Sequence, residues 1–62
     1  MYVIKRIEDG KHVAKFGSSS SYTNDRSQAA EFSSIEEAEA QRCGNESIYQ
    51  SFRETLVRSG DL

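Results

Sequence analysis

The stretch that decides the fold spans residues 2–16 and reads Tyr2-Val-Ile-Lys-Arg-Ile7, Glu8-Asp9-Gly10, Lys11-His-Val-Ala-Lys-Phe16. Apolar and polar residues alternate on both sides of the Asp-Gly pair, and this period of two is typical of β-strands. Gly10 can adopt a positive φ without steric cost, as a tight hairpin turn requires. The stretch therefore predicts an antiparallel β-hairpin.

Two registers fit this hairpin. A two-residue turn at Asp9-Gly10 pairs Ile7 with His12. A three-residue turn with Gly10 at a bulge instead brings four residues to one face: Tyr2, Ile4, Ala14 and Phe16. Because a slip of one residue exchanges the two faces, only one register can hold. We favour the three-residue turn.

The segment after the hairpin predicts a loop and then a helix. Short polar side chains over 17–25 favour turns, and residues 29–32 could add a short third strand beside the hairpin. Ser33-Ser34 followed by Glu36-Glu37 has the spacing of a capping box, and acidic residues suit the positive end of a helix dipole. We expect this helix to run to about Arg42 or Cys43 and to end at Gly44-Asn45.

The C-terminal segment, 46–61, allows two interpretations. As a helix it places four apolar residues on one face: Ile48, Tyr49, Phe52 and Leu56. As a strand, residues 47–52 alternate acceptably. Counting of periods favours the helix. Together these elements predict a single α+β domain over residues 1–62, with an antiparallel hairpin packed on one capped helix and a C-terminal helix or edge strand.

Size and composition limit what this domain can bury and bind. The chain has 62 residues and only 35% hydrophobic residues, so its core is marginal and we expect support from a partner or from self-association as a homodimer. Residues 1–16 carry a net charge of +2 and the remainder −4, which gives a basic hairpin and an acidic helix. No apolar run is long enough to cross a membrane, so a cytoplasmic protein is expected.

Few residues offer catalytic or metal chemistry. His12 and Cys43 have no companions at metal-ligand spacing, so we expect neither a metal nor a cofactor. The same two residues could form a nucleophilic pair, but a domain of this size offers little cleft for a substrate. Glu36 and Glu37 point about 100° apart on a helix and do not converge. We therefore do not expect an enzyme.

The motifs Tyr2-Val-Ile-Lys5, Asp9-Gly-Lys11, Val13-Ala14 and Ala30-Glu-Phe-Ser-Ser-Ile-Glu-Glu-Ala38 resemble a recurring type of small bacteriophage and prophage protein. The similarity covers residues 2–40. The resemblance implies a phage or mobile-element origin and an order of hairpin, short strand, helix and last strand, which would make 47–52 a strand. Some phage proteins of this size inhibit host defence or host enzymes, as anti-CRISPR proteins do.

The function we expect is a non-enzymatic protein-binding module, encoded by a phage and acting as an inhibitor of a host protein or defence complex. Tyrosine and arginine are enriched at protein interfaces, because they combine a large contact area with a polar group. The expected contact residues are therefore Tyr22, Arg42, Tyr49 and Arg53. An exposed edge of the hairpin is an alternative docking surface.

The alternative function is a small nucleic-acid-binding accessory protein. Lys5, Lys11 and Lys15 on the hairpin could contact phosphates, with an aromatic residue beside them for stacking. The net charge of −2 disfavours this interpretation. Lysines on an edge hairpin also discourage unwanted strand pairing.

Overall fold

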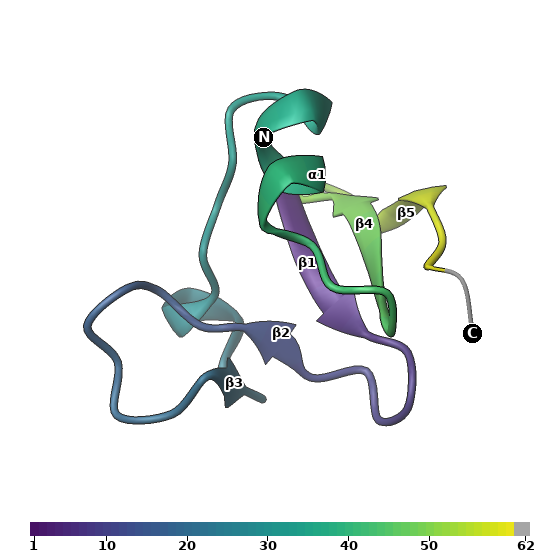
Figure 1. Cartoon of the computed structure of the whole chain (residues 1–62). Helices are drawn as coiled ribbons and strands as arrows, with labels where there is room; N and C mark the ends of the chain where they lie inside the picture. The colour runs from purple at the N-terminus through teal and green to yellow at the C-terminus, as the bar shows by residue number, and fades with distance from the viewer. Residues whose placement is uncertain (61–62) are drawn as a thin grey trace.

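A five-stranded antiparallel sheet forms the body of the computed structural model, which describes residues 1–60 (Figure 1). The strands follow the spatial order β3-β2-β1-β4-β5. Their bounds are β1 Tyr2–Arg6, β2 His12–Val13, β3 Tyr22–Thr23, β4 Glu46–Gln50 and β5 Thr55–Arg58. Within the described residues, the helical elements are a 3₁₀ turn, η1 (Arg26–Gln28), and α1 (Ile35–Gln41). The expected α+β class is confirmed.

One face of the sheet carries the main hydrophobic core. Ile4 of β1 pairs directly with Ile48 of β4, and both side chains are fully buried. Phe32 and Ala38 complete this cluster from the chain before α1 and from α1 itself. We call this side of the sheet the helix face. Val3 is also fully buried, but its side chain points to the opposite side, which we call the open face.

The hairpin forms, but with neither of the two registers expected. Lys5 pairs with His12, and the amide of Arg6 donates to the carbonyl of Lys11 at 2.8 Å, so that four residues form the turn. The Asp9 carboxylate closes this wider turn by accepting from the Arg6 guanidinium and from the Lys11 amide. Gly10 does adopt the expected positive φ, 72°.

The register explains why the favoured apolar face does not form. Phe16 lies in the turn after β2, where 89% of its surface is exposed, and it does not join Ile4 in the core. Val13 takes that place and packs against the core cluster. The amide of Ile7 bonds outside the hairpin. It donates to the carbonyl of Asn45 at 2.9 Å, which extends the ladder between β1 and β4.

The C-terminal helix favoured by period counting is wrong. Residues 46–50 form β4, which lies beside β1, and residues 55–58 form β5 at the edge of the sheet. The strand interpretation of residues 47–52 is correct as far as Gln50, but β4 lies inside the sheet and the C-terminal edge strand is β5. Since β4 pairs with β1 and β3 pairs with β2, both edges of the N-terminal hairpin are occupied, so that hairpin offers no free edge.

A third strand forms inside the segment expected to be a loop, and the segment expected to be the third strand forms none. Tyr22 and Thr23, inside the expected loop, form β3 against β2. Residues 29–32 form isolated bridges only, between Ala14 and Ala29 and between Tyr2 and Phe32. These bridges hold the connecting segment against the sheet and deliver Phe32 to the core.

Helix α1 begins where the sequence predicts. The Ser34 hydroxyl accepts from the amide of Glu37 at 3.1 Å, so of the two caps that the sequence allows, Ser33 or Ser34, the structure uses Ser34. The helix ends at Gln41, one residue before Arg42, which has an extended backbone conformation; the expected left-handed end at Gly44-Asn45 is not used.

Among residues 1–60, no helix has the length and apolarity to span a bilayer.

Candidate functional site

The four expected contact residues separate into two pairs, one that meets at Glu46 on the helix face and one near the edge strand β5. Tyr22 and Arg42 meet at Glu46 on the helix face. The Tyr22 hydroxyl donates to the Glu46 carboxylate, and the Arg42 guanidinium donates to the Glu46 carbonyl at 2.9 Å. Arg42 also forms an ion pair with Glu39 at 2.7 Å, and only 12% of its side chain is exposed. Both residues therefore hold the fold together at this point.

Glu46 is buried, with 2% of its surface exposed, and its two carboxylate oxygens have different partners. One oxygen accepts from the Tyr22 hydroxyl and the other from the Cys43 amide at 2.8 Å. The hydrogen bond to Glu46 is the main cause that raises the pKa of Tyr22 to about 12. The Arg6 guanidinium lies 4.0 Å from the centre of the Tyr22 ring. Within the fold, the hydroxyl of Tyr22 is thus bound to Glu46 and its ring is covered by Arg6.

Tyr49 and Arg53 lie near the edge of the sheet that β5 forms. Tyr49 is on the open face of β4, where the Lys5 ammonium lies 4.6 Å from the centre of its ring. Arg53 is exposed in the turn that joins β4 to β5. Leu56 of β5 pairs directly with Tyr49. The structure therefore places Tyr49 and Arg53 next to the edge strand β5.

The three lysines of the expected nucleic-acid surface are not gathered into one patch. The Lys5 ammonium forms an ion pair with Glu54 at 3.1 Å, and 22% of its side chain is exposed. Lys11 lies between the hairpin turn and β2, and Lys15 lies after β2 and is exposed. Only Lys5 faces the open side of the sheet next to an aromatic ring, and its charge is already paired.

Glu54 is the centre of a polar cluster on the open face that sequence reasoning missed. Its carboxylate lies 3.1 Å from the Lys5 ammonium, 2.8 Å from Nε2 of His12 and 3.3 Å from Nε of Arg26. The hydrogen bond with His12 is the main cause that lowers the pKa of Glu54. Glu54 has a φ of 51°, a left-handed conformation that costs a non-glycine residue roughly 1–2 kcal/mol. The contacts of the carboxylate offset that cost.

The two residues considered for nucleophilic chemistry are not brought together. His12 is on the open face and bonds to Glu54, whereas Cys43 follows α1 and lines a shallow hollow with Tyr22 and Glu46 on the helix face. No group of three or more His, Cys, Asp or Glu side chains in residues 1–60 could hold a metal ion.

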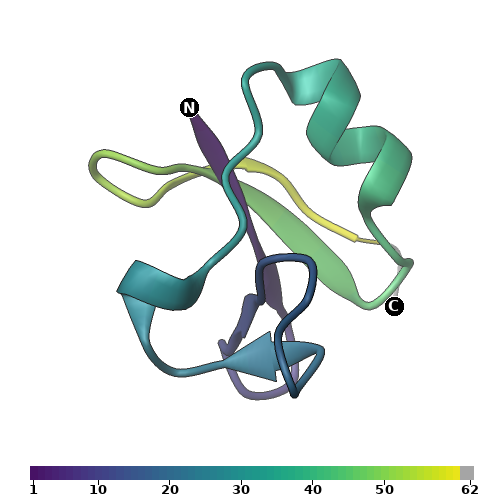
Figure 2. The ribbon, with the colours of Figure 1, turned by 90° about the vertical axis from the view of Figure 1, so that its left-hand side faces the viewer.

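Of the two edge strands, β3 and β5, the more exposed is β5, which carries apolar residues on the surface. All four of its residues are exposed, including Leu56 at 51% and Val57 at 39%. Phe52, at the tip of the preceding turn, is 87% exposed. In Figure 2 this turn extends away from α1. We call Phe52, Arg53, Leu56 and Val57 the β5 edge surface.

Arg58 is the charged residue of β5, and it does not block this edge. Its guanidinium forms an ion pair with Glu39 of α1 at 3.2 Å. Exposed edge strands are usually protected by a charge, a proline or a covering segment. Within residues 1–60, no strand pairs with the outer side of β5. The inner side of β5 pairs with β4, and the backbone groups on its outer side are available for pairing with another strand.

A signal for this surface was present in the sequence. Thr55-Leu56-Val57 contains two β-branched residues, which favour a strand over a helix. Helical periodicity in the preceding residues outweighed this signal.

No protein-family model, curated protein or solved structure matches this chain.

Proposed function

We propose that this chain is a non-enzymatic protein-binding module whose partner docks on the β5 edge surface. The observation that carries the proposal is the open edge of β5, where Leu56 and Val57 are exposed and are preceded by the exposed Phe52 in the β4–β5 turn. An extended segment of a partner can pair with such an edge through main-chain hydrogen bonds, while its side chains contact the exposed apolar residues. The inhibitor of a host protein expected from the phage resemblance is one form of this activity.

The composition of the surface suits a protein partner. It combines one large aromatic ring, two aliphatic side chains and one arginine, and arginine and aromatic residues are enriched in interface hot spots. Tyr49 lies next to Leu56 and extends the surface over the open face. Two of the four expected contact residues, Tyr49 and Arg53, are thus retained in this proposal.

The fold explains why these apolar residues can be left exposed. The main core is built by Ile4, Phe32, Ala38 and Ile48, without a contribution from β5. Apolar residues that do not pack in the core can contact a partner, and exposed apolar patches often mark interaction sites. The nucleic-acid alternative has less support, because the ammonium of Lys5 is bound to Glu54.

Affinity capture with matched variants tests the proposal. The tagged chain is incubated with lysate of the cells that produce it, and bound protein is compared between wild type, Leu56→Lys and Ile7→Lys. Both substitutions replace an exposed aliphatic residue by lysine, but Ile7 lies in the β1–β2 turn, outside the β5 edge surface. We expect wild type and Ile7→Lys to capture the same protein at low and high salt, and Leu56→Lys to lose it.

Two results would contradict the proposal. Equal capture by Leu56→Lys would exclude β5 as the docking edge. Recovery of nucleic acid at low salt, and of nothing at high salt, would support the alternative function, because phosphate contacts weaken steeply as salt rises.

A further inference from the structure

Aromatic rings and carboxylates hold cations at two places in this fold. Arg6 lies 4.0 Å from the Tyr22 ring while its guanidinium donates to both oxygens of Asp9, at 3.1 and 2.5 Å. Lys5 lies 4.6 Å from the Tyr49 ring while its ammonium is bound to Glu54. In each case one cation is shared between the face of a ring and a carboxylate, an arrangement in which both contacts favour a positive charge.

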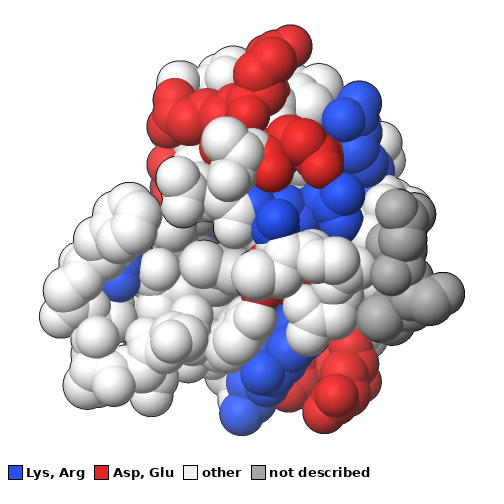
Figure 3. Space-filling view, viewed as in Figure 1, with Lys and Arg blue, Asp and Glu red and all other residues white. Residues whose placement is uncertain are grey.

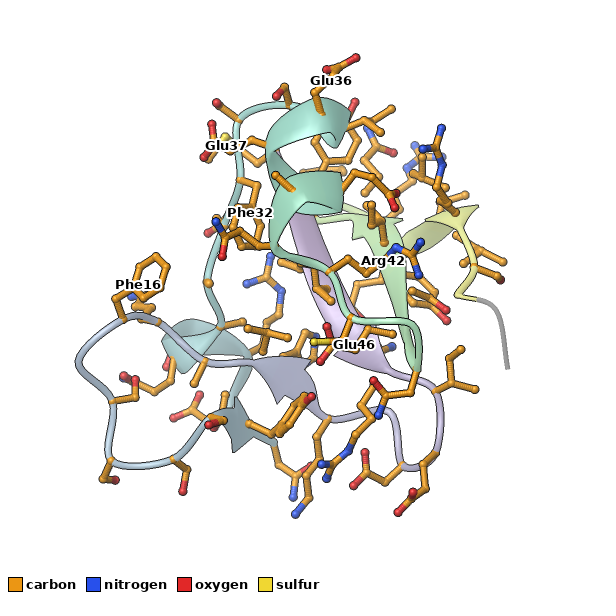
Figure 4. All side chains as sticks on the ribbon, in the orientation of Figure 1. Phe16, Phe32, Glu36, Glu37, Arg42 and Glu46 are labelled. Atoms are coloured by element: carbon orange, nitrogen blue, oxygen red, sulfur yellow. The ribbon has the colours of Figure 1, made fainter. Side chains whose placement is uncertain are left out.

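A third combination of a ring and carboxylates lies in a groove between the turn after β2 and the start of α1. We call it the Phe16 groove. It has a volume of about 370 Å³ and is lined by Lys15, Phe16, Ala30, Glu31, Phe32 and Glu37. Phe32 and Ala30 form an apolar floor, and Phe16 stands at the rim with 89% of its surface exposed. In Figure 4, Phe16, Phe32 and Glu37 lie on the same side of the ribbon, whereas Glu36 points away from them.

The carboxylates of the Phe16 groove retain acceptor capacity. Within residues 1–60, the Glu37 carboxylate accepts from the Ser33 hydroxyl at 2.9 Å and has no basic partner. Glu31 has a single long ion pair, 4.0 Å from Arg26. In the same described part of the chain, no cation lies over the Phe16 ring. Acidic side chains also gather over α1 at the top of Figure 3, so the field around the groove favours positive charge.

Lys15 is the basic residue that lines the groove. Hydrogen bonds from Ser27 lower the pKa of Asp25, and the positive charge of Lys15 lowers it further. The two acidic side chains of the lining outnumber this lysine, and the net charge of the lining is −1.

We propose that the Phe16 groove binds an arginine side chain from a basic segment of a protein partner. The guanidinium stacks on the exposed Phe16 ring and donates to Glu37, while the aliphatic stem covers Phe32 and Ala30. Arginine is favoured over lysine, since its planar group can stack on a ring and donate two parallel hydrogen bonds to one carboxylate. The groove lies away from the β5 edge surface and is a second, independent point of contact.

The probe for this proposal is the peptide acetyl-Gly-Arg-Gly-Arg-Gly-amide, titrated into the ¹⁵N-labelled chain and followed by NMR. We expect saturable shifts at the amides of Phe16, Glu31 and Glu37, with weaker binding as salt rises. The same peptide with citrulline in place of arginine has the same shape without the charge, and it should not bind.

Three variants place the contact. Phe16→Ala and Glu37→Gln should each weaken binding by about three- to ten-fold. Glu36→Gln removes an equal charge from the same helical turn outside the groove and should change binding by less than about two-fold, since exposed charges act weakly at a distance. In the Glu37→Gln variant the new amide oxygen can still accept from the Ser33 hydroxyl, so the helix start is preserved.

The outcomes separate this proposal from the β5 docking proposal. Leu56→Lys should bind the peptide as wild type does. Absence of shifts at millimolar peptide, equal binding of the citrulline peptide, or unchanged binding by Phe16→Ala would each overturn the arginine site. None of these results would bear on partner capture through β5.

Discussion

Nε2 of His12 lies 2.8 Å from Oε2 of Glu54, although the two residues are 42 positions apart in the chain. His12 is in β2 and Glu54 is in the turn before β5, and β1 and β4 separate these strands in the sheet. The contact therefore joins the first hairpin to the last across the open face. His12 is 8% exposed, so the partner of its ring nitrogen matters for stability.

Replacing Glu54 should destabilise the fold. Glu54→Gln keeps the shape and the left-handed backbone strain but removes the charge that binds Lys5, His12 and Arg26. We expect a loss of about 1–3 kcal/mol in the free energy of unfolding at neutral pH, measured by urea denaturation. Glu31→Gln removes a carboxylate with a single ion pair at 4.0 Å and should change stability by less than about 0.5 kcal/mol. Equal effects of the two substitutions would contradict a central role for Glu54.

The contribution of Glu54 should disappear in acid. Its pKa is lowered in the folded state, so the ionised form stabilises the fold above the pKa of the unfolded chain, about 4.3 for glutamate. That stabilisation is lost as pH falls through the lower, folded-state pKa. The difference in unfolding free energy between wild type and Glu54→Gln should therefore be constant above about pH 5 and shrink below about pH 4. A difference that does not change down to about pH 2 would show that the charge of Glu54 is not its cause.

Local signals in the sequence predicted the elements that depend on local chemistry. Gly10 specifies the first turn and Ser34 specifies the start of α1, because a positive φ and a cap hydrogen bond are decided within a few residues. The hairpin register was not predictable in the same way. It depends on the Asp9 carboxylate and on the pairing of Ile7 with Asn45, a contact between residues 38 positions apart.

The C-terminal segment shows the limit of period counting. Ile48, Tyr49 and Phe52 fit a helical face, but Ile48 is buried through its pairing with Ile4 of β1. That pairing is a tertiary contact, and it outweighs a weak local preference. The same limit applies to the candidate site: residue type identified Tyr22 and Arg42, but only the structure shows that both are engaged with Glu46.

Tyr22→Phe should destabilise the helix face. The substitution removes the hydroxyl that donates to Glu46, a residue that is 2% exposed and whose carboxylate would keep only the Cys43 amide as its described partner. An unsatisfied buried acceptor costs about 1–3 kcal/mol. The free energy of unfolding should fall by that amount at neutral pH. Tyr49→Phe is the matched control, since no hydrogen bond holds the Tyr49 hydroxyl within residues 1–60, and it should be nearly neutral.

The same hydrogen bond should be visible in alkaline titration. The pKa of Tyr22 is raised to about 12 in the folded state, above the unfolded value of about 10. The neutral hydroxyl thus stabilises the fold below about pH 10, and this contribution is lost as pH rises towards 12. Tyrosinate absorbance of the wild type should include a step near pH 12 that Tyr22→Phe lacks. If both proteins titrate identically up to that pH, the hydroxyl of Tyr22 is not held by Glu46.

The phenylalanines should differ sharply in their effect on stability. Phe32 is 5% exposed in the core, and Phe32→Ala should cost about 3–5 kcal/mol, enough to unfold much of a 62-residue domain. Phe16 and Phe52 are 89% and 87% exposed, and replacing either by alanine should change stability by less than about 0.5 kcal/mol. Thermal unfolding of the three variants measures this contrast. A large loss in Phe16→Ala or Phe52→Ala would mean that these rings support the fold, and would remove the reason to assign them to binding.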